Sequence, residues 1–152
     1  MARRIPRWLA RAPIPLYRHG IGRLLTRRLM MLEHRGRRSG LPRYVVLEVV
    51  DREPGVLFLV SGHGPRSHWF RNLQADPRVR VWNGPDRGIP ARATVLPGEE
   101  TRQRLERYRQ RSRRAAAALG RALDIPELRG TGPLPADVAQ RLPLVRLVFA
   151  DG

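Results

Sequence analysis

The chain has 152 residues and a hydrophobic fraction of 41%, which fit one domain with its own core and exclude a globally disordered protein. It contains no cysteine, so a disulfide framework and thiolate chemistry are excluded, and no run approaches the ~20 apolar residues of a membrane span. All 30 basic residues are arginine, against 13 acidic residues, and the net charge of +17 favours anionic partners: nucleic acid, anionic lipid or a polyanionic cofactor.

The N-terminal arm, residues 1–28, holds eight arginines and no acidic residue. Apolar residues recur in it at helical spacing between prolines, which predicts two short amphipathic helices. One interpretation is that their apolar stripes cap the domain; the other is that they lie on an anionic membrane, with Trp8 and Tyr17 at the interface. The arm lacks the uninterrupted apolar core of a signal peptide, so we expect a cytoplasmic protein whose membrane contact, if present, is peripheral and on the inner face.

Three strands are predicted next, at Leu29–Arg35, Tyr44–Val50 and Val56–Gly62. The second is β-branched and mostly apolar, so we expect it to be well buried, and "DREPG" forms the hairpin turn that follows it. The first two strands are joined by "HRGRRSGLPR", which starts at His34 and holds four arginines and two glycines in ten residues.

A short helix is predicted at "SHWFRNLQADP", where Ser67 can cap the first turn and Pro77 lies beyond the last one. Two segments of alternating polarity follow, Arg78–Trp82 and Ile89–Leu96, and both are predicted to be half-exposed strands. Pro90 would place the start of the second of these strands at a sheet edge, because proline donates no ladder hydrogen bond.

A long helix is predicted over Glu99–Leu123, with acidic side chains in its first turn and one apolar face. The chain closes with a predicted strand at Leu142–Phe149. Six strands with hairpin links and few crossovers predict a mainly β, α+β protein built on an antiparallel barrel. The predicted organisation is therefore a helical arm, residues 1–28, and a barrel domain, residues 29–152.

The turn between the first two strands can hold an anion. Gly36 and Gly40 permit backbone angles that bring amide N–H groups together, and the turn adds arginine guanidinium groups and a serine hydroxyl: Arg37, Arg38, Ser39 and Arg43. Each hydrogen bond to a charged group contributes roughly 1.5–3 kcal/mol, so a few of them would hold a phosphate. The alternative is an ordinary glycine turn whose arginines are solvated.

Two motifs in series carry a family resemblance. The first is the turn itself, and the second is a small-residue loop followed by W-x-x-N-L-x-A-x-P, here Ser61 and Gly62, then Trp69, Asn72, Leu73, Ala75 and Pro77. Together they cover about residues 29–96, and in this order they resemble the deazaflavin-dependent nitroreductase family, small F420-dependent oxidoreductases of the split β-barrel class. The resemblance implies coenzyme F420 as cofactor, with FMN as second choice, and a small organic electron acceptor of the quinone, nitro or enone type.

The resemblance also implies roles for individual residues. Arg37, Arg38, Ser39 and Arg43 would hold the phosphodiester of F420 and the start of its glutamate tail. Ser61 and Gly62 would let the ring approach the backbone closely. Trp69 and Asn72 fall on one face of the short helix; Trp69 could equally be a core residue, whereas Asn72 would bond loop backbone near the cofactor.

The substrate side departs from the family pattern. The strand after Arg43 lacks a proline near Val46, the loop from Ser61 to Trp69 is short, and the sequence offers no certain tyrosine donor. Tyr108 on the long helix is the best candidate for a proton donor or substrate contact, with Tyr44 and Tyr17 behind it and a core role as the alternative. The acceptor therefore stays open, and related split barrels suggest a homodimer without any interface signature here.

Other functions receive less support from the sequence. The four histidines, His19, His34, His63 and His68, show no metal-ligand spacing, so no metal is expected, although His63 and His68 flank the supposed cofactor loop. A basic nucleic-acid-binding barrel is the rival from another class, but only 6% of the residues are aromatic and the arginines are not arranged in a stripe. A non-catalytic carrier of F420, flavin, haem or fatty acid is the third interpretation.

Overall fold

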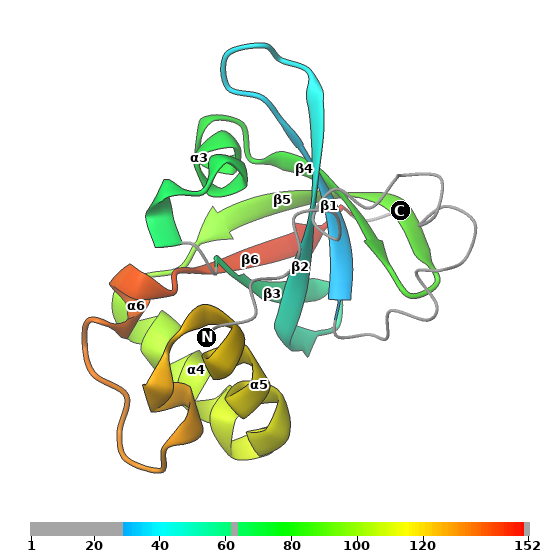
Figure 1. The fold of residues 1–152 in the computed structure, drawn as a ribbon. Helices are drawn as coiled ribbons and strands as arrows, with labels where there is room; N and C mark the ends of the chain where they lie inside the picture. Colours follow the sequence, from blue (N-terminus) through cyan, green and yellow to red (C-terminus); the bar gives the residue numbers. More distant parts are fainter. Residues whose placement is uncertain (1–28, 62–63, 151–152) are drawn as a thin grey trace.

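The computed structural model describes residues 29–61 and 64–150 (Figure 1). Six strands and four α-helices follow one another in it, joined by turns and by two 3-10 segments, Gly64–Arg66 and Pro126–Arg129: β1 (Leu29–Arg35), β2 (Pro42–Glu53), β3 (Val56–Val60), α3 (His68–Ala75), β4 (Arg78–Asn83), β5 (Asp86–Val95), α4 (Gly98–Arg111), α5 (Arg113–Leu123), α6 (Val138–Arg141) and β6 (Leu144–Phe149). The predicted helices of residues 1–28, with Trp8 and Tyr17, lie outside the described residues, as do Gly62 and His63.

The strands form a closed barrel in the order β1-β2-β3-β6-β5-β4, and every neighbouring pair is antiparallel. This confirms the predicted fold class, a mainly β barrel of about six antiparallel strands with helices added. The β1–β2 turn extends from one end of the barrel beside α3, whereas α4, α5 and α6 gather at the other end (Figure 1).

The barrel interior follows the two-residue period of its strands. On β1, Met30 and Leu32 point inward and are fully buried, and they pack with apolar residues of all the other strands. Met31, between them, points outward and packs against Trp82 and Tyr44. From α3, Trp69, Phe70 and Leu73 join the interior cluster and so close the end of the barrel below the β1–β2 turn.

The predicted helix over Glu99–Leu123 is wrong in one respect, because the chain breaks at Ser112 into α4 and α5. Ser112 has φ −138° and ψ 64°, outside the helical region. The break lets Leu105 and Tyr108 of α4 and Leu119 of α5 bury their side chains in the same apolar layer, which also takes in Phe58 of β3.

Two local predictions also need correction. Pro90 lies inside β5 and not at its start, and its missing N–H is tolerated because β6 pairs with β5 only up to Ala91. The Pro90 carbonyl accepts a hydrogen bond from Ala150 N at 2.9 Å. Ser67 stands at the N-cap position of α3, but its hydroxyl makes no cap bond and contacts the hydroxyl of Ser61 at 3.0 Å instead.

Candidate functional site

The β1–β2 turn is a tight, defined loop. Gly36 N donates to Leu41 O at 2.9 Å, and Gly40 N donates to Gly36 O at 2.8 Å. Gly40 has φ +69°, in the left-handed region that favours glycine. Leu41 N donates to Ser39 Oγ at 3.2 Å, so this hydroxyl already accepts one bond within the turn. A β-carbon at Gly36 would come within 2.5 Å of the same hydroxyl oxygen, so a side chain there would displace the Ser39 hydroxyl.

Asn72 attaches the turn to α3. Its Oδ1 accepts two hydrogen bonds from Arg37, one from the backbone N at 3.1 Å and one from Nη1 at 2.8 Å. The other guanidinium nitrogen, Nη2, lies 3.4 Å from His68 Nδ1. The side chain of Asn72 is buried, so these bonds are made at the floor of the turn. The prediction that Asn72 bonds loop backbone describes this geometry, but the guanidinium of Arg37 is engaged in it as well.

His34 lies beneath the same network. The histidine is 4% exposed, and its Nδ1 is 3.1 Å from Asn72 Nδ2, which makes Nδ1 the acceptor of that bond. Burial, together with the positive charge of Arg43, lowers the pKa of His34 from 6.5 to about 4. His34 is therefore neutral at physiological pH, and a chain of three side chains runs from the barrel interior to the turn: His34, Asn72, Arg37.

Positive charge accumulates on the outside of the turn. Arg38 and Arg43 are exposed, and Arg71 is exposed on α3 nearby. Partial desolvation and then the charges of Arg71 and Arg38 lower the pKa of the Arg37 guanidinium. In the described part of the chain, none of Arg38, Arg43 and Arg71 forms an ion pair with a carboxylate. Such a group of unneutralised arginines is suited to bind a multivalent anion.

Ser61 and Trp69 occupy buried positions. Ser61 is fully buried, and its Oγ donates to Gly64 O at 2.7 Å, so its hydroxyl closes the loop that follows β3. Trp69 is 6% exposed and packs edge-on against Phe70 with 5.9 Å between ring centroids. The surroundings of Trp69 are therefore those of a core residue. Asn72 lies one helical turn further along α3 and contacts the β1–β2 turn.

Tyr108 lies in the layer formed by α4, α5 and α6, called the helical layer below, and is not brought together with the arginine turn (Figure 1). Its ring is 4% exposed, and its hydroxyl donates to Glu48 Oε1 at 2.9 Å. Glu48 is five residues beyond Arg43 on β2, about 17 Å along the strand. Tyr44 lies nearer the turn, and its hydroxyl donates to Glu33 Oε2 at 2.9 Å.

Sequence reasoning missed His34 and Arg71 as members of this site. The inward phase of His34 was readable, because it follows Met30 and Leu32 at the two-residue period of β1. Arg71 carries no such signal, since it is one exposed arginine among thirty. The described residues contain no cluster of three or more histidine and carboxylate side chains that could hold a metal ion. None of the helices described is long and apolar enough to cross a membrane.

Comparison with known proteins gives consistent results. The family model for F420H(2)-dependent quinone reductase matches residues 11–123. A Mycobacterium tuberculosis protein named "Putative F420H(2)-dependent quinone reductase" is 33% identical over 73 residues, which are 47% of this chain and 60% of that protein, so the match spans less than two thirds of the relative's length.

Solved structures share the fold. An F420-H2 dependent reductase (FDR-A) superposes with a TM-score of 0.52 at 25% identity, covering 80% of this chain and 95% of that one. The heme storage protein HutZ from Vibrio cholerae superposes with a TM-score of 0.53 at 18% identity, covering 99% of this chain and 92% of that one. At that identity the second likeness concerns the fold alone.

Proposed function

The chain belongs to the F420H(2)-dependent quinone reductase family, and from this premise we propose that it reduces a small quinone-type acceptor with F420H2 bound at the β1–β2 turn. The observation that supports this site is the group of arginines at the turn that no carboxylate of the described residues neutralises. F420 carries a phosphodiester and a glutamate tail, so its negative charges match what the turn presents. FMN, with one phosphate, matches it less well.

The donor set fits such a ligand. Arg38 and Arg43 are exposed and have guanidinium groups available for charge-assisted bonds to phosphate oxygens. Ser39 Oγ accepts from Leu41 N and keeps its own proton to donate. Arg37 has a different role in this proposal: its guanidinium is held by Asn72, so it fixes the shape of the turn and adds charge.

The protein's part in the reaction is binding and orientation. Reduced F420 supplies a hydride to the acceptor when it is bound. The turn and its Asn72 tether would anchor the charged end of the cofactor, and α3 below it keeps water out of the barrel end through Trp69 and Phe70. The Tyr108 hydroxyl donates a hydrogen bond to Glu48 in this structure, and its role as a proton donor or substrate contact stays a prediction.

The test is a cofactor titration of three variants. Arg38→Ala and Arg43→Ala should each weaken F420 binding about ten- to a hundredfold, the equivalent of roughly 1.5–3 kcal/mol, because each would remove a charged hydrogen bond to the ligand. Arg113→Ala is the matched control, since Arg113 is an exposed arginine on α5. All three should keep their melting temperature. Equal weakening by Arg113→Ala would mean that the cofactor responds to net charge and not to the turn.

The arm forms a separate part of the proposal. With eight arginines and no acid in residues 1–28, it would hold a cytoplasmic protein on the inner face of an anionic membrane. Deletion of residues 1–18 should then reduce sedimentation with anionic vesicles and leave F420 binding intact. Loss of the fold on deletion would instead assign the arm to the domain as a cap.

A further inference from the structure

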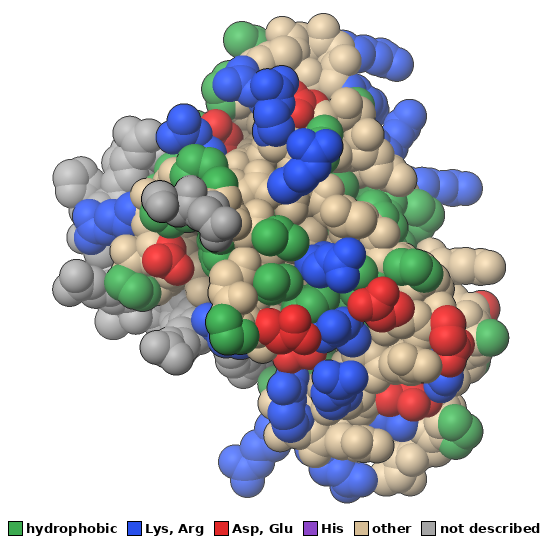
Figure 2. Space-filling model, turned by 180° about the vertical axis from the view of Figure 1, so that it is seen from behind, with side chains coloured by type: hydrophobic (Ala, Val, Ile, Leu, Met, Phe, Trp, Pro, Cys, Tyr) green, Lys and Arg blue, Asp and Glu red, His purple; other side chains and the backbone are tan. Residues whose placement is uncertain are grey.

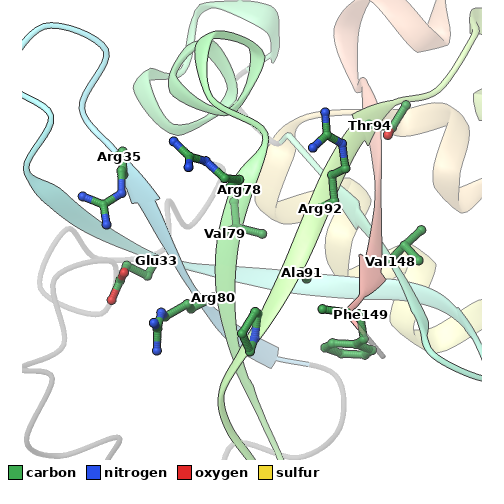
Figure 3. Close-up of a pocket in the computed structure, with 12 residues that line it drawn as sticks. Glu33, Arg35, Arg78, Val79, Arg80, Ala91, Arg92, Thr94, Val148 and Phe149 are labelled. Atoms are coloured by element: carbon green, nitrogen blue, oxygen red, sulfur yellow. The ribbon is translucent and has the colours of Figure 1, made fainter. Parts of the chain in front are cut away.

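A second feature, outside the β1–β2 turn, is a groove on the outer surface of the barrel. It has a volume of about 760 Å³ and runs over β1, β4, β5 and β6. A volume of this size suits a small molecule. Figure 3 shows its lining in two rows that cross the strands: Arg35, Arg78, Arg92 and Val148 in one, and Glu33, Arg80 and Phe149 in the other.

The strand register places like charges next to one another in this groove. Arg78 on β4 is directly opposite Arg92 on β5. Glu33 on β1 is opposite Arg80 in the last pair of that ladder, and Arg35 and Arg78 each lie two residues beyond this pair on their own strands. Adjacent strands are about 4.8 Å apart, and like charges in directly opposite positions destabilise a sheet. Like charges therefore meet across β4 and β5, although Asp76 holds Arg78 and raises the pKa of its guanidinium.

Few acidic groups relieve this charge. Asp76 Oδ1 and Oδ2 accept bonds from Arg78 at 3.0 and 3.1 Å, and Glu33 accepts the hydroxyl of Tyr44 at 2.9 Å. Within residues 29–61 and 64–150, neither Arg80 nor Arg92 has a carboxylate in ion-pair contact.

The other half of the groove is apolar. Val148 is 44% exposed, one of the two large hydrophobic side chains that the described surface leaves uncovered. Pro90 and Ala150 continue this surface beside β5, together with Phe149, which is partly buried and also packs against the interior cluster.

We propose that this groove binds a free amphipathic anion, a carboxylate on an apolar body, with the head group between Arg80 and Arg92 and the body against Val148 and Phe149. The ligand would neutralise Arg80 and Arg92 and cover the exposed side chain of Val148 at once. The site is separate from the Asn72-held turn, although Arg35 touches both: it lines the groove, and its Nη1 lies 3.3 Å from Gly40 O.

The experiment titrates the full-length protein with decanoate, 1-decanol and acetate, by calorimetry and without F420. Decanoate should bind. Decanol, which has the apolar chain without the charge, and acetate, which has the charge without the chain, should each bind at least about tenfold more weakly. Arg80→Gln combined with Arg92→Gln should weaken decanoate binding by about tenfold or more, whereas Arg113→Gln should change it less than twofold.

A thermal melt separates a ligand site from a structural one. Arg92→Gln removes the like charge opposite Arg78, so its melting temperature should stay equal or rise. Equal binding of decanol and decanoate, or unchanged decanoate affinity in the double variant, would overturn the proposal. A third outcome would also overturn it: no decanoate binding, together with sedimentation with phosphatidylglycerol vesicles that the double variant loses. That result would assign the groove to a lipid surface. Because no F420 is present, each outcome is independent of the proposed reductase function.

Discussion

Asn72→Ala is the substitution that most directly tests how the arginine turn is held. Asn72 Oδ1 accepts from Arg37 N and Arg37 Nη1 at 3.1 and 2.8 Å, and Nδ2 lies 3.1 Å from His34 Nδ1. The alanine variant loses all three contacts and leaves the buried His34 without this partner. A neutral bond contributes about 1 kcal/mol and one to a charged group about 1.5–3 kcal/mol, and water replaces part of the loss on the Arg37 side, so we expect a cost of about 2–4 kcal/mol.

Urea unfolding measures that cost, with Gln74→Ala as the control because Gln74 is an exposed amide on the same helix. A double-mutant cycle with Arg37→Ala should give a coupling energy of about 1–2 kcal/mol, since the two residues share bonds. F420 affinity should fall in Asn72→Ala as the turn loses its tether. A cost below about 0.5 kcal/mol, or zero coupling, would refute the conclusion that Asn72 holds the turn.

Three further variants test other parts of the structure. Because the pKa of His34 is about 4 in the folded protein and about 6.5 in the unfolded chain, the free energy of unfolding should be highest above pH 6.5 and should fall by up to about 3 kcal/mol as the pH drops to about 4. His34→Gln should flatten that part of the plot of urea midpoint against pH, and an unchanged plot would contradict the assignment. Asp51→Asn should cost about 2–4 kcal/mol in urea unfolding, because the 3% exposed carboxylate accepts from Arg104 at 3.1 Å and Arg111 at 2.7 Å; a loss below about 1 kcal/mol would show that these bonds do not hold α4 to the barrel. Gly120→Ala should lower the melting temperature despite alanine's better helix propensity, because its β-carbon would lie 2.7 Å from Ile125 O; a higher melting temperature would mean that the chain moves aside there.

The strands were predictable because their signals are local. Each combines a two-residue period or an apolar run with a turn, and all six exist within a few residues of their predicted bounds. The resemblance to F420-dependent split-barrel reductases could be recognised for the same reason, because its two motifs are short and contiguous. The family match confirms it. The break at Ser112 was not predictable in this way. It lets α4 and α5 pack on one apolar layer, which is a property of the folded chain.

The candidate site shows the same limit. The turn was identified from its glycines and arginines, but the bonds that join Arg37, Asn72 and His34 span 35 and 38 residues, and no local pattern indicates them. Sequence reasoning treated Arg37 and Arg38 alike. The structure separates them, because one guanidinium is held by a buried amide and the other is exposed at the surface.

The same separation applies to the arginines as a whole. Because the chain contains no lysine, the presence of arginine at a position carries little information about its role, and the role is read from the groups around it. The ion pairs of the described residues lie mainly on the helical layer and the strands beside it, and Figure 2 shows acidic and basic side chains intermingled in its lower half. The paired arginines there include Arg102, Arg104, Arg111 and Arg141. At the other end of the barrel and in the outer groove, where Arg78 is paired with Asp76, five arginines have no carboxylate of the described residues in ion-pair contact: Arg38, Arg43, Arg71, Arg80 and Arg92. Because the helical layer neutralises much of its own charge, much of the excess charge of the described residues falls on the two surfaces where an anion would be bound.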